Sequence, residues 1–155
     1  MTKTSAAILA VSLTVAAAAG AAWAQGVALP VVKFQIKDGG IPASLTGRPG
    51  DPQKGRAAMV DQKLGNCLAC HEVTALKSEP YHGNVGPSLD GVASRLSEAQ
   101  IRLRIVDPTK LNADTMMPPF YRVDGLNRVL KQFQGKPILT AEQVEDVVAF
   151  LETLK

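Results

Sequence analysis

The sequence predicts an all-α domain preceded by an extended N-terminal arm. Two segments carry the capping-box spacing that marks helix starts, Ser97 with Gln100 and Thr140 with Gln143. After the second box, apolar residues recur at the spacing of one helix face: Val144, Val147, Val148, Leu151 and Leu154. No stretch from residue 51 onward shows the alternation of a half-buried strand, so helices and loops should make up the domain.

The first 24 residues have the features of a secretory signal peptide. A short basic start, Met1 to Lys3, precedes an apolar run over residues 6–22 that is mostly Ala, Val and Leu. The run ends in Ala22-Trp23-Ala24, the small-x-small pattern at which signal peptidase cuts. We therefore expect export to the periplasm, cleavage after Ala24 and no membrane span in the mature chain. An uncleaved membrane anchor is the alternative.

Residues 25–50 are expected to form an extension that packs on the domain or on a partner. Loop-forming residues recur along it: Pro30, Gly39, Gly40, Pro42, Gly47, Pro49 and Gly50. A short strand over residues 31–36 is the one regular element predicted there.

The domain is expected to occupy residues 51–155 and to hold four helices. The first should run from Asp51-Pro52 to Leu64, because Asp caps helices well and Pro fits the first helical position. The helix that Ser97 begins should end before Pro108, since the residue preceding a proline avoids helical backbone. Apolar spacing over residues 126–133 predicts a third helix, and the Thr140 box begins the last.

Charge and composition argue against a nucleic-acid partner and favour a protein that binds a large cofactor. The 17 basic residues nearly balance the 14 acidic ones, which does not favour a nucleic-acid partner. Aromatic residues make up only 5% of a short chain, so its capacity to build a core is limited. A flat, rigid, apolar cofactor would supply much of the missing core.

Cys67-Leu68-Ala69-Cys70-His71 has the C-x-x-C-H spacing of covalent haem c attachment. Cysteines three positions apart lie about one helical turn apart, so both sulfurs can reach the two vinyl-derived carbons on one haem edge. The adjacent His71 can then place its imidazole on the iron. We predict one covalently bound haem c, attached through Cys67 and Cys70 and ligated by His71.

Three other uses of the cysteines fit less well. Structural zinc needs four ligands, and this chain has only two Cys and two His. A thioredoxin-like redox pair needs a strand–helix context, which the sequence lacks. A disulfide suits an exported protein, but so short a loop would add little order.

Met117 is the expected second axial ligand, because electron-carrying haem proteins pair His with Met. Two prolines follow it, which fix the backbone in an extended form and remove two amide donors. Met116 and His82 remain alternatives, with His82 expected to be an exposed loop residue. Met59 is expected in the core, and gap-filling is the ordinary role of any loop methionine.

No catalytic residue is predicted. If haem consumes both cysteines and the iron is six-coordinate, the chain has neither a free thiol nor an open metal position for substrate. Three arginines are expected on a solvated face, with haem propionates or an acidic partner as alternative contacts: Arg95, Arg102 and Arg104. The chain should move single electrons.

The sequence resembles the class I cytochromes c. The shared features are Gly55 in the first helix, the C-x-x-C-H motif, Gly86-Pro87-Ser88-Leu89 with Gly91, the Met-Pro loop, and an aromatic residue in the last helix. The resemblance implies that Gly55 and Phe150 lie where the first and last helices cross. It also implies that Pro87 flanks His71.

A narrower resemblance is to SoxX, the small cytochrome subunit of the periplasmic sulfur-oxidising system. It rests on residues 41–47 leading to Gly50-Asp51-Pro52, and on residues 65–71, 116–120 and 145–151. The resemblance implies a heterodimer with a larger haem-bearing subunit, SoxA. Such a pair oxidatively couples thiosulfate to a cysteine of a carrier protein, an L-cysteine S-thiosulfotransferase-type reaction. This chain would accept the electrons and pass them to a downstream acceptor cytochrome.

Two other functions remain open. A free-standing monohaem carrier would have the same haem site, although the 25–50 extension favours a subunit because a diffusing carrier gains little from an ordered arm. A haem-based ligand sensor or peroxidase-like site would require an open axial position.

Overall fold

The computed structural model describes residues 31–155, so the predicted signal peptide lies outside the described residues. The α-helices are α1 (Pro52–Val60), α2 (Val92–Arg95), α3 (Glu98–Val106) and α4 (Ala141–Leu151). Short 3₁₀ turns lie at Cys67–Ala69, Thr74–Leu76, Pro108–Lys110 and Lys131–Phe133. The described residues contain no β-strand, so the all-α prediction is confirmed.

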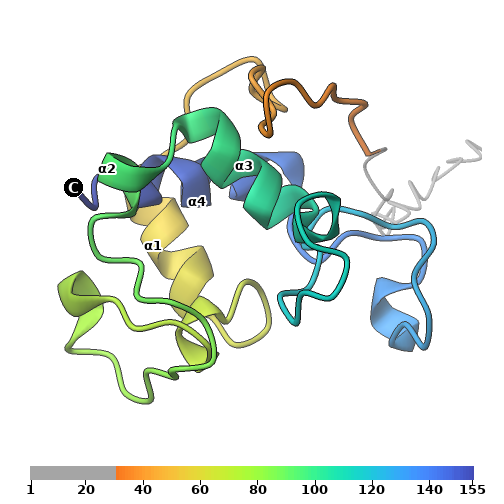
Figure 1. Ribbon diagram of the computed structural model, residues 1–155. Coiled ribbons are helices and arrows are strands. Elements are labelled where there is room, and N and C mark those ends of the chain that lie inside the picture. Colours follow the sequence, from red (N-terminus) through yellow and green to blue (C-terminus); the bar gives the residue numbers. More distant parts are fainter. Residues whose placement is uncertain (1–30) are drawn as a thin grey trace, which may run out of the picture.

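Helices α1 and α4 cross in close contact (Figure 1). A Cβ atom on Gly55 would lie 1.9 Å from the carbonyl oxygen of Asp146, and one on Gly50 would lie 2.1 Å from that of Glu145. Only glycine allows two backbones to approach this closely. Gly55 therefore lies at the crossing, as the resemblance to class I cytochromes c implies, and Phe150 is buried on the same helix α4.

The predicted start of α1 is correct, but the helix ends four residues earlier than expected. The Asp51 carboxylate accepts hydrogen bonds from the amides of Gln53 and Lys54, with Pro52 at the first helical position. At the other end, the Asp61 carboxylate accepts from the amide of Lys63 at 2.7 Å. Such a local side-chain bond competes with continued helix, so the chain leaves α1 at Val60 and proceeds in turns.

Both predicted capping boxes form. The Ser97 and Gln100 side chains bond each other's amides at the start of α3, and Thr140 and Gln143 do the same at the start of α4. Helix α3 ends at Val106, before Pro108, as predicted. The predicted apolar stripe is buried: Val144, Val147, Val148 and Leu151 in α4, and Leu154 just beyond its end.

The helix predicted over residues 126–133 is wrong, because only the 3₁₀ turn Lys131–Phe133 forms there. Gly125 and Arg128 both have positive φ, at 68° and 53°, which is incompatible with a right-handed helix through them. Leu130 remains 67% exposed, so the apolar spacing does not correspond to a buried face. A segment this short gains too little from packing to offset helix nucleation.

The arm, residues 31–50, packs across α3 and α4. Ile41 and Leu45 are buried in the core, and the Ile41 amide donates to the carbonyl of Ala99 at 2.9 Å. The strand predicted over residues 31–36 is wrong, because this extended segment has no paired strand among the described residues. The amide of Val32 instead donates to the Tyr121 hydroxyl at 2.9 Å.

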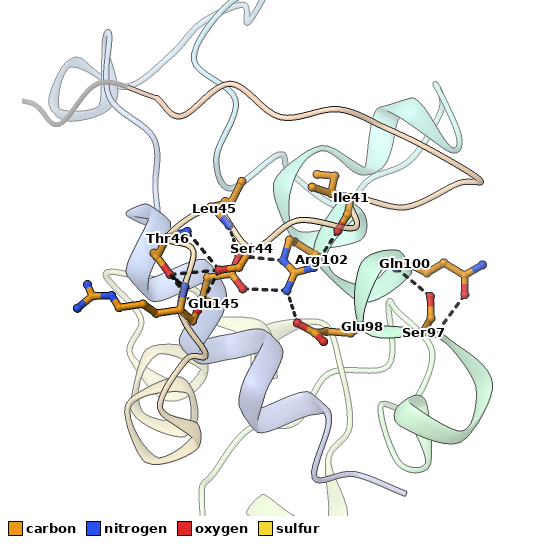
Figure 2. A network of polar contacts seen from close by, with 10 residues as sticks. Ile41, Ser44, Leu45, Thr46, Ser97, Glu98, Gln100, Arg102 and Glu145 are labelled. Atoms are coloured by element: carbon orange, nitrogen blue, oxygen red, sulfur yellow. Dashed lines mark hydrogen bonds and ion pairs between the residues drawn. The ribbon is translucent and has the colours of Figure 1, made fainter.

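A buried ion pair fixes the arm to the helices (Figure 2). The Arg102 guanidinium donates from Nε to Oε1 of Glu145 at 2.8 Å and from Nη2 to Oε2 at 2.9 Å. Arg102 also donates to the carbonyl of Ile41 at 2.8 Å, while Glu145 accepts from the Leu45 amide at 2.9 Å. Two helices and two points on the arm therefore meet at one charged pair, with Glu98 as a further acceptor for Arg102.

The expectation that Arg102 lies on a solvated face is wrong, since its side chain is only 1% exposed. Burial by itself would lower the pKa of Arg102, but hydrogen bonds and charge from Glu145 and Glu98 raise it, so the guanidinium stays charged. Arg95 is exposed and donates to the carbonyls of Asp90 and Ser88. Arg104 is half-buried and donates to the carbonyl of Gln100.

Within residues 31–155, no helix combines the length and the apolar character that crossing a membrane would require.

Replacing Arg102 by Ala is expected to destabilise the holoprotein by about 3–5 kcal/mol, because Glu145 would be left charged and buried without its partner. Denaturant unfolding followed by circular dichroism measures the change. Lys54→Ala is the matched control, since Lys54 is 74% exposed in a 4.0 Å pair with Asp51 and should change stability by about 1 kcal/mol or less. Equal losses of stability in the two variants would contradict the stabilising role of the buried Arg102–Glu145 ion pair.

Candidate haem site

The C-x-x-C-H motif folds into a single tight turn. Asn66 enters it with left-handed backbone, at φ 45°, and the 3₁₀ turn Cys67–Ala69 follows. The amides of Cys70 and His71 both donate to the Cys67 carbonyl, at 3.2 and 2.9 Å. The turn therefore holds Cys67, Cys70 and His71 within one closed backbone loop.

Cys67 and Cys70 form no disulfide, and both are half-buried. Burial raises the pKa of the Cys67 thiol to about 12, with the charge of Cys70 adding to the effect. Among the described residues, no group of three or more His, Cys, Asp and Glu side chains is arranged to hold a metal ion.

The His71 ring is held by the Pro87 carbonyl and by Gly86. Nδ1 lies 2.7 Å from the Pro87 oxygen, which can only accept, so Nδ1 carries the proton. That tautomer leaves a lone pair on Nε2, the nitrogen that can ligate iron. A Cβ atom on Gly86 would lie 2.3 Å from Cε1 of His71, so only glycine fits against the ring. Pro87 therefore does flank His71, as the resemblance implies.

The two loop methionines differ in burial. Met116 is 83% exposed, whereas Met117 is half-buried and packs against the core. The Met117 amide donates to the Thr115 hydroxyl at 3.2 Å. Just beyond, Phe120 donates to the Ile105 carbonyl at 3.1 Å, which anchors the loop to α3. Met59 is fully buried in α1, as expected.

His82 is half-buried, not the exposed loop residue expected, and both its ring nitrogens are occupied. Nδ1 accepts from the Val73 amide at 3.2 Å, and Nε2 lies 3.1 Å from the Leu76 carbonyl. Its partners lie in the segment that follows His71, so the side chain stabilises that loop. No local pattern in the sequence predicts these contacts, because they depend on the loop returning over itself.

None of the curated proteins compared with this chain matches it. The sequence profile of the cytochrome c family matches residues 52–155. The chain belongs to the cytochrome c family. This cytochrome accordingly carries covalently bound haem c, and Cys67 and Cys70 fit the attachment motif.

Among solved structures, this cytochrome is similar to a chain of SoxXA from P. pantotrophus. The two are 42% identical, with a TM-score of 0.75, and the match covers 83% of this chain and 99% of that chain. The resemblance to SoxX inferred from the sequence motifs is thereby confirmed.

The residues of the site fit a haem c. The thiols are unpaired, the His71 tautomer leaves Nε2 available, and a half-buried thioether lies in the loop after α3. Figure 1 shows the segment that follows α1 (light green) below α1 and the segment that follows α3 (teal) beside the end of α3.

Gly86→Ala is expected to displace the His71 ring, since the added methyl would lie 2.3 Å from Cε1 of His71. Most of the recovered protein should lose the low-spin haem spectrum or lack haem. Absorption spectra of the exported protein measure both. Asn84→Ala, at an exposed position of the same loop, is the control and should retain the wild-type spectrum. A wild-type spectrum for Gly86→Ala would contradict this packing.

Proposed function

We propose that this chain is the electron-accepting subunit of a heterodimeric, SoxAX-like complex that oxidises thiosulfate. The single observation that supports this most strongly is the 42% identity to a SoxXA chain over 99% of that chain's length. The second subunit would be a larger haem-bearing, SoxA-like protein. Further partners would be a carrier protein with a reactive cysteine and a downstream acceptor cytochrome.

The proposed site residues are Cys67 and Cys70 as thioether attachments, with His71 and Met117 as axial ligands. The hydrogen bond of His71 Nδ1 to Pro87 supports ligation through Nε2. The half-burial of Met117, against the 83% exposure of Met116, supports Met117. A thioether ligand favours ferrous iron and so raises the potential of an electron acceptor.

The proposed chemistry divides between two chains. Joining the terminal sulfur of thiosulfate to a cysteine thiol forms one S–S bond and releases two electrons and one proton. Bound haem supplies a one-electron iron couple, so the two electrons would leave one at a time. This chain has no cysteine beyond Cys67 and Cys70, so the sulfur chemistry of an L-cysteine S-thiosulfotransferase-type reaction would take place on its partners. The role of Cys67, Cys70 and His71 is to hold and orient the redox group.

The proposed location is the periplasm, with residues 1–24 removed as a signal peptide. The mature chain would then consist of the extension over residues 25–50 and the cytochrome domain over residues 51–155. The described part of the extension supports a fixed arm, because Ile41 and Leu45 are buried and hydrogen-bonded to α3 and α4.

Met117→Ala is expected to abolish the sulfur-to-iron charge-transfer band in the far-red spectrum of the oxidised protein, because it removes the proposed ligand. Met116→Ala, the matched control at the exposed neighbouring position, should leave the band intact. The reverse pattern would assign the ligand to Met116. A band that persists in both variants would show that neither methionine ligates the iron.

Affinity purification of the tagged chain from its own host is expected to recover a second haem-bearing polypeptide in about equal amount. Haem staining of a denaturing gel separates the two, since thioether-bound haem stays with each chain. Recovery of this chain only as a haem-bearing monomer would contradict the subunit proposal and support a free-standing electron carrier.

A further inference from the structure

A second segment of chain runs beside the haem motif and is bonded to it at successive positions. The amide of Gly86 donates to the Cys70 carbonyl at 2.8 Å, and the amide of Leu89 donates to the Glu72 carbonyl at 3.0 Å. Between these two bonds lies the contact of His71 Nδ1 with the Pro87 carbonyl. The position of the Pro87 oxygen therefore depends on how residues 86–90 are held.

Pro87 can donate no backbone hydrogen bond to fix its own position, because proline has no amide hydrogen. Upstream of it, Gly86 is bonded to Cys70. Downstream, the neighbouring carbonyl of Ser88 accepts from Nη2 of Arg95 at 3.1 Å. Nη1 of the same guanidinium donates to the carbonyl of Asp90. Arg95, from the end of α2, thus fastens two carbonyls of the segment that presents Pro87 to His71.

Asp90 joins the segment that follows His71 to the segment that follows Pro87. Its Oδ1 accepts from the amide of Thr74 at 2.8 Å, and its Oδ2 accepts from the Thr74 hydroxyl at 2.5 Å. Thr74 lies three residues beyond His71, so Asp90 ties the chain on the histidine side to the chain on the proline side. Hydrogen bonds from Thr74, with the positive charge of Arg95, hold the pKa of Asp90 below its usual value.

We propose that Asp90 and Arg95 are positioning residues for His71: together they hold the Pro87 carbonyl against Nδ1 and thereby tune the iron ligand. The proposal rests on the proposed ligation of haem iron by His71. A strong Nδ1–H···O bond makes the imidazole a more basic ligand, which favours ferric iron. Loosening residues 86–90 should weaken that bond and raise the reduction potential.

The exposure of these side chains argues against a mainly packing role. Arg95 and Thr74 are exposed and Asp90 is half-buried, so the three side chains contribute little apolar burial. What they contribute is the geometry of four directed hydrogen bonds.

Two matched pairs of holoprotein variants test the proposal by redox titration. Asp90→Ala removes both contacts with Thr74, whereas Asp90→Asn removes the same charge but can keep both contacts. Arg95→Ala removes the two carbonyl contacts, whereas Lys77→Ala removes one positive charge at an exposed position three residues beyond Thr74. We expect a higher potential for Asp90→Ala than for Asp90→Asn, and for Arg95→Ala than for Lys77→Ala.

A second measurement reports the hydrogen bond itself. Solvent exchange of the His71 Nδ1 proton, followed by NMR, should be roughly three- to tenfold faster in Asp90→Ala and Arg95→Ala, the range expected for one weakened hydrogen bond. Equal potentials within each pair, with unchanged exchange, would overturn the proposal even if stability falls. A wild-type spectrum lacking histidine ligation would instead contradict the proposed function on which it rests.

Discussion

The close approach of α1 and α4 is the constraint on which the rest of the structure depends. Gly55 and Gly50 bring two stretches of chain against the backbone of α4, and no larger residue fits at either position. Because α1 is fixed there, its last turn and the turn that carries Cys67 and Cys70 are fixed as well. Because α4 is fixed there, Glu145 lies where Arg102 can reach it, and the arm has a place to attach.

The elements that the sequence predicts correctly are those whose determinants are local. The capping boxes at Ser97 and Thr140 place both orphan amides and their acceptors within four residues, so tertiary structure does not alter them. The haem motif is equally local, since its turn is closed by bonds to the Cys67 carbonyl. Only the resemblance to class I cytochromes c predicts the role of Gly55, because the backbone that it contacts belongs to α4, far along the chain.

The errors have two causes: local backbone geometry that the apolar pattern does not report, and partners that are distant in sequence. Residues 126–133 have helical spacing, yet Arg128 and Gly125 take left-handed backbone and Leu130 stays 67% exposed. Arg102 looks like a surface charge until Glu145 is placed opposite it; the i,i+4 spacing of Glu98 and Arg102 was the one local sign of a pairing. Asp90 and Arg95 escape sequence reasoning for the same reason, since their contacts join two loops.

The attachment of the arm has a practical consequence for gene design. A chain shortened to begin at the first α-helix would retain the whole haem motif but would lose Ile41 and Leu45, two residues of the hydrophobic interior. Arg102 and Glu145 would each lose a backbone partner in the same truncation. Expression clones should therefore begin upstream of Val31, and fusion junctions and protease-cleavable tags should be placed there too. Fragments trimmed to residues 52–155, the segment that the family profile matches, should be prone to aggregation.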